Sequence, residues 1–148
     1  MNMMTIVERE MTNAEVDRMK AGFAEHSAAH GNPPNPSVRY GFVALTEEKF
    51  AGCSSGLTND NGRWFYLSDL FVEEPLRRQG YGAALLRKLE QKVASLGAQR
   101  IWTWTAGFEA PVFYKKQGYE VFCEMEDWYP SGHGRVGLWK RLRQMEPV

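Results

Sequence analysis

The sequence predicts an α/β domain in which helices flank a sheet of mixed antiparallel and parallel strands. Strand-like segments follow one another directly in the first half of the chain, whereas strand-like and helical segments alternate in the second half. The chain has 148 residues, of which 43% are hydrophobic and 13% aromatic, and this is enough apolar material for one core. We therefore expect a single domain over residues 1–148.

The first half of the chain is expected to form a helix and then a meander of strands. Thr12 and Glu15 have the spacing of a capping box, so the helix is expected to begin there. The proline-rich stretch 31–36 ends it. Three strand-like segments follow, at 38–45, 50–57 and 64–72. Hairpin-type turn residues at 59–62 favour antiparallel pairing. The third segment is apolar along most of its length, which is typical of a strand covered on both faces.

The second half of the chain changes between helical and strand periodicity. Residues 80–96 carry leucine and valine at helical spacing, and Gly97 follows as a C-terminal signal. The remaining segments are interpreted as a strand at 99–105, a short helix at 108–117, and strands at 119–125 and 136–142. Together with the meander, this order predicts the mixed architecture.

The charge balance argues against nucleic-acid and lipid partners. Lys and Arg together number 18, Asp and Glu also number 18, and the formal net charge is zero. No apolar run approaches the length of a bilayer span, and the start has no signal-peptide core. Cys53 and Cys123 lie far apart and form no CxxC pair. We expect a cytoplasmic protein with no nucleic-acid partner and no membrane partner.

Two smaller patterns have open or weak interpretations. His26 and His30 have a spacing that metal ligands use on helices, but no third ligand accompanies them, so no metal site is expected. The aromatic and glycine-rich segment 128–134 either lines an acceptor pocket or simply connects the last two strands.

The most informative segment is 70–83, in which a buried strand runs through a short loop into a glycine-flanked helix start. The first turn of a helix has free backbone N–H groups and the positive end of the helix dipole. Gly80 and Gly82 allow an anion to come close to those amides, and Arg77 and Arg78 add positive charge. These features are typical of a phosphate or pyrophosphate site. The glycine spacing matches neither a P-loop nor a dinucleotide-binding fingerprint.

Two segments of the chain resemble the signatures of the GNAT acetyltransferase superfamily. Residues 77–82, Arg-Arg-Gln-Gly-Tyr-Gly, are similar to its Arg/Gln-x-x-Gly-x-Gly/Ala motif. Residues 110–119 are similar to its Ala-x-x-Phe-Tyr-x-x-x-Gly-Phe/Tyr segment. The two lie in the expected order, and the element order matches over nearly the whole chain. The resemblance implies the GNAT fold, N-acetyltransferase activity and acetyl-CoA as co-substrate, and it leaves a homodimer open.

The resemblance also implies a set of cofactor-binding residues. Backbone groups of the strand at 70–72 would pair with the pantetheine arm of acetyl-CoA, in a gap where two strands diverge. Amides from Arg78 to Ala83 would hold the pyrophosphate. The full set implied in this way is Leu70, Phe71, Val72, Arg77, Arg78, Gln79, Gly80, Tyr81, Gly82, Ala83, Ala110 and Phe113.

Tyr114 is the predicted catalytic donor, because the resemblance places it near the thioester sulfur. A phenol with a pKa of about 10 stays protonated at neutral pH and can donate a hydrogen bond to a thiolate, whose free pKa is about 8.5. This hydrogen bond would stabilise the leaving group. The simpler interpretation is that Tyr114 is a core aromatic of a short helix.

The proton acceptor for the attacking amine is less well defined. An alkylamine has a pKa of about 10.4, so its proton must be removed before it attacks. Relatives often carry an acid on the strand before the glycine motif, at a position where this chain has Ser68. Asp69 is the carboxylate nearest to that position and is the candidate base. Asp69 could equally be a strand-end acid bound to neighbouring amides. A water chain to one of three other acids is a further option: Glu73, Glu74 or Glu109.

The expected reaction is direct attack of an amine on the thioester, since neither cysteine lies in a nucleophile motif. The acceptor is either a small-molecule amine or a peptide amine. A second hypothesis is an acyl-CoA-binding sensor or interaction module with weak catalysis. The absence of an acid at Ser68, and Gly107 where many relatives carry asparagine, favour that alternative, whereas Tyr114 opposes it.

Overall fold

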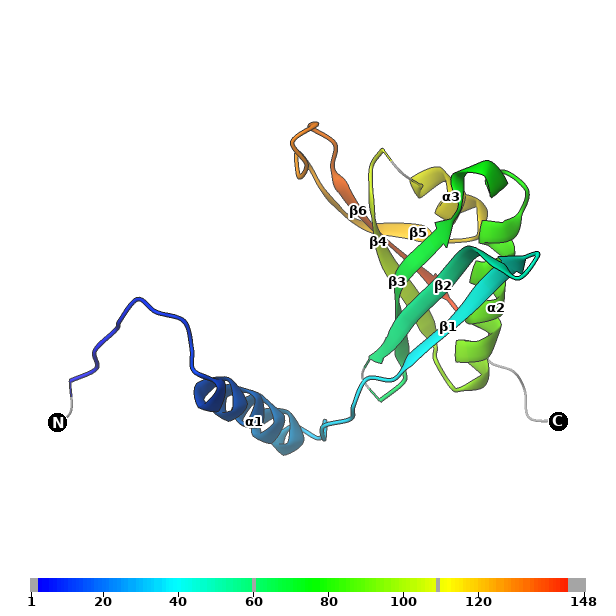
Figure 1. The fold of residues 1–148 in the computed structure, drawn as a ribbon. Helices are drawn as coiled ribbons and strands as arrows, with labels where there is room; N and C mark the ends of the chain where they lie inside the picture. The colour runs from blue at the N-terminus through cyan, green and yellow to red at the C-terminus, as the bar shows by residue number, and fades with distance from the viewer. Residues whose placement is uncertain (1–2, 60, 109, 144–148) are drawn as a thin grey trace. The chain divides into compact units, whose positions relative to one another are not determined.

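The structure, a computed structural model, describes residues 3–59, 61–108 and 110–143. The chain divides into two compact units, Met1–Asn35 and Pro36–Val148. The first contains one helix, and the second contains the sheet and the remaining helices (Figure 1). The single domain expected over 1–148 stays a prediction.

The first unit contains helix α1 (Asn13–Ala29), which begins with the predicted capping box. The Glu15 amide donates to Thr12 Oγ1 at 3.2 Å, and the Thr12 amide donates to Glu15 Oε1 at 2.9 Å. Arg9 adds an ion pair, with 2.8 Å between its Nη1 and Glu15 Oε1. The Arg9 hydrogen bond, followed by those from Thr12, lowers the pKa of Glu15 to about 2. The start of α1 is therefore occupied by the protein's own side chains.

The second unit is built on a six-stranded mixed sheet with the order β1-β2-β3-β4-β6-β5. The strands are β1 (Arg39–Thr46), β2 (Lys49–Asn59), β3 (Trp64–Val72), β4 (Arg100–Ala106), β5 (Glu120–Met125) and β6 (Arg135–Arg141). Only β3 and β4 pair in parallel, and the other neighbours are antiparallel. The predicted element order is thus confirmed. Asp60, in the expected hairpin turn, lies outside the described residues.

The helices of this unit are α2 (Tyr81–Ser95) and α3 (Pro111–Lys116), together with a short 3-10 turn, η1 (Glu74–Leu76). The turn was not expected from the sequence; Pro75 lies within it. Helix α3 is shorter than the predicted span of 108–117. It begins at Pro111 because a proline fits the first helical position, while the residue before a proline is disfavoured in a helix.

The core lies between one face of the sheet and helices α2 and α3 (Figure 1). Its largest fully buried side chains include Phe65, Leu67, Leu86, Leu89, Ile101 and Leu138. The opposite face of the sheet is rich in tryptophan, and Trp64, Trp102 and Trp139 are half-buried there. Helices α2 and α3 pack on the Phe65 side of β3, and the expectation that its other face is also covered stays a prediction.

Candidate active site

Strands β3 and β4 separate after three residue pairs, and the candidate site lies where they diverge. Their parallel pairing covers only Trp64–Tyr66 of β3 and Arg100–Trp102 of β4. At the next position the Thr103 hydroxyl donates to the Leu67 carbonyl oxygen at 2.9 Å. The remainder of β3, up to Val72, pairs with β2 on its other side only. This geometry contains the gap between two strands that the family resemblance implied.

A β-bulge at Ser68 turns this side chain toward the gap. In the pairing of β2 with β3, Asp69 lies opposite Ser55 and Leu67 lies opposite Gly56, so Ser68 is the extra residue. Gly56 makes the bulge possible, because a Cβ there would come within 2.1 Å of the Tyr66 carbonyl oxygen. The consequence is that a serine, and not a core side chain, lines the cavity at this position.

Helix α2 begins without a side-chain cap, and its first turn borders the gap. Gly80 is the N-cap residue, directly before the helix, and it has a φ of 87° that favours glycine. The first hydrogen bond of the helix runs from the Ala84 amide to the Gly80 carbonyl oxygen at 3.0 Å. The three amides between them have no acceptor within the helix. A Cβ at Gly80 would meet nothing within 4 Å, so there is open space in front of these amides.

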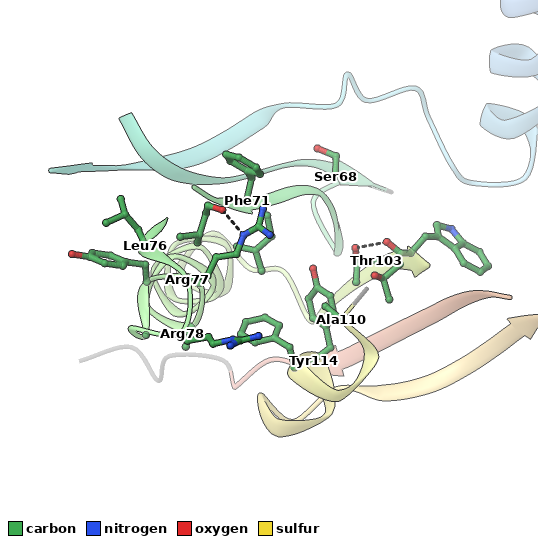
Figure 2. Close-up of a pocket in the computed structure, with 17 residues that line it drawn as sticks. Ser68, Phe71, Leu76, Arg77, Arg78, Thr103, Ala110 and Tyr114 are labelled. Atoms are coloured by element: carbon green, nitrogen blue, oxygen red, sulfur yellow. Dashed lines mark hydrogen bonds between the residues drawn. The ribbon is translucent and has the colours of Figure 1, made fainter. Parts of the chain in front are cut away.

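Two arginines add positive charge beside this helix start. The Arg77 guanidinium donates from Nε to the Val72 carbonyl oxygen at 2.9 Å and lies 5.9 Å from the centroid of the Phe71 ring. Arg78 has a φ of 64°, so the chain turns sharply just before Gly80. Figure 2 shows both arginine side chains extending over the pocket from the end where α2 begins. This end of the pocket combines free amides, a helix dipole and two cations, which suits a phosphate group.

A cavity of about 540 Å³ connects the start of α2 with α3 through the gap between the strands. Its lining includes all of the cofactor-binding residues expected from the resemblance except Gln79: Leu70, Phe71, Val72, Arg77, Arg78, Gly80, Tyr81, Gly82, Ala83, Ala110 and Phe113. Gln79 instead directs its side chain to the Pro75 carbonyl oxygen, 3.4 Å away. The five remaining lining residues besides Tyr114 were not part of the expected set: Ser68, Leu76, Thr103, Trp104 and Thr105.

Tyr114 also lines the cavity, and its side chain is buried within the core cluster. Figure 2 shows its ring rising from α3 into the pocket. Its ring packs edge-on against Phe113, with 5.3 Å between the centroids, and against Tyr119, with 5.4 Å. Tyr114 is therefore a core aromatic and also a lining residue of the cavity, and its role as a catalytic donor stays a prediction.

Asp69 does not line the cavity, but Ser68 connects it to the cavity wall. The Ser68 hydroxyl donates to Asp69 Oδ2 at 2.7 Å and lies 3.2 Å from the Ser55 carbonyl oxygen. Arg39 donates to Ser68 Oγ at 3.1 Å and lies 3.8 Å from Asp69 Oδ2. The carboxylate is thus one hydrogen bond away from a residue that lines the cavity.

Among the described residues, neither the other predicted acids nor the 128–134 loop lines this cavity. Glu73 and Glu74 are not among the cavity's lining residues, and Glu109 lies outside the described residues. No described residue of the 128–134 loop lines the cavity either. Gly107 approaches the backbone of this loop closely, since a Cβ there would lie 3.2 Å from the Gly134 carbonyl oxygen. An asparagine at position 107 would therefore require the loop to move.

Within the ranges given above, no three His, Cys, Asp or Glu side chains are arranged to hold a metal ion. Over the same part of the chain, no helix is both long and apolar enough to cross a bilayer.

The lining residues that were not predicted from the sequence lie on β4, at the bulge and, for Leu76, on η1. Thr103 and Thr105 alternate with Trp102 and Trp104, so the strand pattern indicated which pair shares a face. It did not indicate that the threonine face lines a cavity, because that depends on where β4 leaves β3.

Solved structures with the same fold are acetyltransferases. The structure aligns with an acetyltransferase from Bacillus cereus ATCC 14579 at a TM-score of 0.81 and 27% identity, covering 93% of this chain and 98% of that one. It aligns with an aminoglycoside 6'-N-acetyltransferase in complex with coenzyme A at a TM-score of 0.66 and 19% identity, covering 88% and 90% of the two chains. These alignments confirm the predicted fold.

The sequence comparisons point the same way. An L-ornithine N5-acetyltransferase from Arabidopsis thaliana is 38% identical over 64 residues, which is 40% of this chain and only 27% of that protein. The family model described as the acetyltransferase (GNAT) family matches residues 3–119, most of the chain. The chain belongs to the GNAT acetyltransferase family.

Proposed function

We propose that the protein transfers an acetyl group from acetyl-CoA to a primary amine, by direct attack in a ternary complex. The observation that carries this proposal is one continuous cavity. It joins the uncapped N-terminus of α2 to Tyr114 through the gap between β3 and β4. One end has the chemistry to hold a phosphate, and the other end has a phenol.

Acetyl-CoA fits the groups that line this cavity. The amides of Tyr81, Gly82 and Ala83 precede the first intrahelical bond, so they are the donors for its pyrophosphate. The backbone of β3 beyond Tyr66 has no pairing with β4 and would hydrogen-bond the pantetheine arm in the way a strand does. Gly82 leaves space beside the Phe113 ring, where a Cβ would make an ordinary van der Waals contact at 3.6 Å.

The proposed chemistry uses two hydroxyl groups of the chain. When bound, acetyl-CoA supplies the thioester carbonyl and a thiolate leaving group. Tyr114 would donate a hydrogen bond to the departing sulfur, because the residue lines the cavity and a phenol O–H is a donor to a thiolate. Ser68 would take a proton from the attacking amine while passing its own proton to Asp69 Oδ2, 2.7 Å away.

A covalent enzyme intermediate is not part of this proposal. Cys53 is partly buried on β2, and burial, followed by the Asp69 charge, raises the pKa of its thiol. The thiol therefore stays protonated near neutral pH and is a poor nucleophile. Direct attack by the amine requires no such residue.

The acceptor is proposed as a small-molecule or peptide amine. Two relatives are named for amine acceptors, an ornithine N5-acetyltransferase and an aminoglycoside 6'-N-acetyltransferase, and both acceptors carry primary amines. Their names support an amine as the acceptor class for this chain but do not choose between the two. A homodimer and a cytoplasmic location remain predictions.

The test is thiol release from acetyl-CoA, measured with L-ornithine, aminoglycosides, polyamines and a short peptide. We expect turnover with at least one amine and a fall in kcat of about a hundredfold for Tyr114→Phe, the lower range for loss of a general acid. Val112→Ala, on the same helix but outside the cavity lining, is the matched control and should keep wild-type kcat.

Two results would contradict the proposal. Tight CoA binding with no turnover on any amine would favour the acyl-CoA sensor. Turnover that Tyr114→Phe leaves unchanged would remove Tyr114 from the mechanism while leaving the transfer reaction intact.

A further inference from the structure

Tyr119 is anchored to two charged side chains behind the cavity. It is 3% exposed, and its hydroxyl donates to Glu90 Oε2 at 2.7 Å. Lys140 Nζ donates to the same carboxylate at 3.1 Å and lies 5.7 Å from the centroid of the Tyr119 ring. Glu90 is on α2, Tyr119 directly precedes β5, and Lys140 is on β6. The cluster therefore joins three parts of the fold.

Tyr119 in turn contacts Tyr114 through both ring and backbone. The two rings meet edge to face, with 5.4 Å between centroids and 64° between their planes. The Tyr119 amide also donates to the Tyr114 carbonyl oxygen at 3.0 Å, just after α3 ends. Helix α3 has only six residues, too few to hold a fixed orientation by itself. Contacts outside the helix must therefore set the direction of the Tyr114 ring.

We propose that Tyr119 is a positioning residue for acetyl transfer: anchored by Glu90 and Lys140, it holds the Tyr114 ring so that the phenol points into the cavity. This inference rests on the proposed function, because it assumes that Tyr114 assists the leaving group. The residues that position a donor matter because a displacement of about 1 Å can cost a hundredfold in rate.

The environment of Tyr119 suits a permanent anchor. Burial, followed by the Glu90 charge, raises the pKa of its hydroxyl far above its ordinary value of 10.0, so it keeps its proton and remains a donor. The Glu90 carboxylate is largely buried and lies 3.1 Å from the Lys140 ammonium, so Tyr119 donates to a paired side chain. Tyr119 thereby ties α3 to α2, the helix whose first turn lines the other end of the cavity.

Gly118 brings Tyr119 into this position. It has a φ of 93°, which turns the chain from α3 into β5, and a Cβ there would come within 3.5 Å of the Lys140 side chain. A glycine is therefore favoured between the donor helix and its anchor.

The experiment is a double-mutant cycle on Tyr119→Phe and Tyr114→Phe, assayed with the amine that gives the highest turnover. Tyr119→Phe keeps the ring and removes one buried hydrogen bond of about 1 kcal/mol, so we expect kcat to fall roughly fivefold. The KM for acetyl-CoA should change by less than a factor of two. In the Tyr114→Phe background, Tyr119→Phe should have no further effect on kcat, because it acts through the Tyr114 hydroxyl.

Tyr40→Phe is the matched control, since Tyr40 is a partly buried tyrosine packed against the same core but away from Tyr114. It should leave kcat at the wild-type value. Independent, multiplicative effects of Tyr114→Phe and Tyr119→Phe would overturn the proposal. An unchanged kcat in Tyr119→Phe would also overturn it, while leaving the proposed function standing.

Hydrogen exchange gives a readout that needs no turnover. Tyr119→Phe should speed exchange at the end of α3, where the Gln117 amide donates to Phe113 and Tyr114, and should leave the Leu85–Leu89 stretch of α2 unchanged. If the α3 amides exchange as in the wild type, the anchor is overturned even if no amine is acetylated. Absence of transfer in the wild type would instead refute the proposed function.

Discussion

The two long helices of this chain begin in opposite ways. Helix α1, with 17 residues, starts from Thr12, whose side chain and that of Glu15 satisfy one another's amides. Helix α2, with 15 residues, starts from Gly80, which has no side chain to offer. The first helix therefore uses its N-terminus for its own stability, whereas the second leaves its amides facing a cavity.

This difference shows what a missing cap can mean. A helix start without a cap loses up to about 2 kcal/mol of stability. In α2 this cost is offset by the burial of Leu86, Leu89 and Val93 against the sheet, so the helix does not depend on its first turn. The open amides can then serve a ligand.

The largest expected effect comes from placing an acid at the open start. Gly80→Asp puts a carboxylate next to the proposed phosphate site, and a unit charge at about 8 Å with an effective dielectric of about 20 costs about 2 kcal/mol. Calorimetric titration with CoA should therefore give a Kd roughly thirtyfold higher than that of the neutral variant Gly80→Asn. Both variants tolerate the left-handed backbone that Gly80 adopts.

The neutral variant separates charge from shape in this comparison. Gly80→Asn has the size of the acid without its charge, so it should bind CoA more tightly than Gly80→Asp and respond less to added salt. Equal affinity of the two variants would mean that the start of α2 is not the phosphate site.

A smaller effect is expected at the capped start. Thr12→Ala removes one half of the capping box, and such a loss costs about 1 kcal/mol of helix stability. Amide exchange in the first turn of α1 should speed up roughly fivefold, while the Kd for CoA should stay at the wild-type value. A Thr12→Ser variant keeps the hydroxyl and should behave as the wild type. A large change in CoA affinity in Thr12→Ala would break the distinction between the two helix starts.

The smallest expected effect is a pH dependence confined to α1. Hydrogen bonds from Arg9 and then Thr12 lower the pKa of Glu15 from 4.5 to about 2. A lowered carboxylate pKa stabilises the folded form above 4.5, and this contribution is lost as the pH falls from 4.5 toward 2. The Thr12 amide resonance should shift across this window in an NMR titration. Glu15→Gln should abolish the shift, and its persistence there would assign the titration to another group.

Local sequence patterns predicted the elements well because each depends on neighbours in the chain. The capping box of α1 and the glycine at the start of α2 involve residues three or fewer positions apart. The strand order of the meander followed from the short turns between segments. Segment 70–83 indicated the proposed phosphate end of the cavity for the same reason. Of its residues that were expected to bind the cofactor, every one except Gln79 lines the cavity.

The rest of the site depends on contacts between distant parts of the chain. The bulge that turns Ser68 toward the cavity comes from its register against β2, which residue spacing does not specify. Thr103 reaches Leu67 across 36 positions, and Lys140 reaches Glu90 across 50. Such pairs become visible only once the sheet order is known. For this reason the sequence identified Asp69 as a candidate base but not the hydroxyl that connects it to the cavity.

The short pairing between β3 and β4 has a consequence for how the sheet holds together. Three residue pairs are all that join the meander β1-β2-β3 to the antiparallel group β4-β6-β5 through backbone ladders. The sheet therefore consists of two groups of strands that are joined only by these three pairs among the described residues. Beyond the pairs, β3 and β4 are not hydrogen-bonded as a ladder. A ligand that lies between the unpaired parts of β3 and β4 would add contacts between the two groups of strands. It would bind the folded chain and not the unfolded one. Its concentration would then set part of the protein's resistance to unfolding, by mass action.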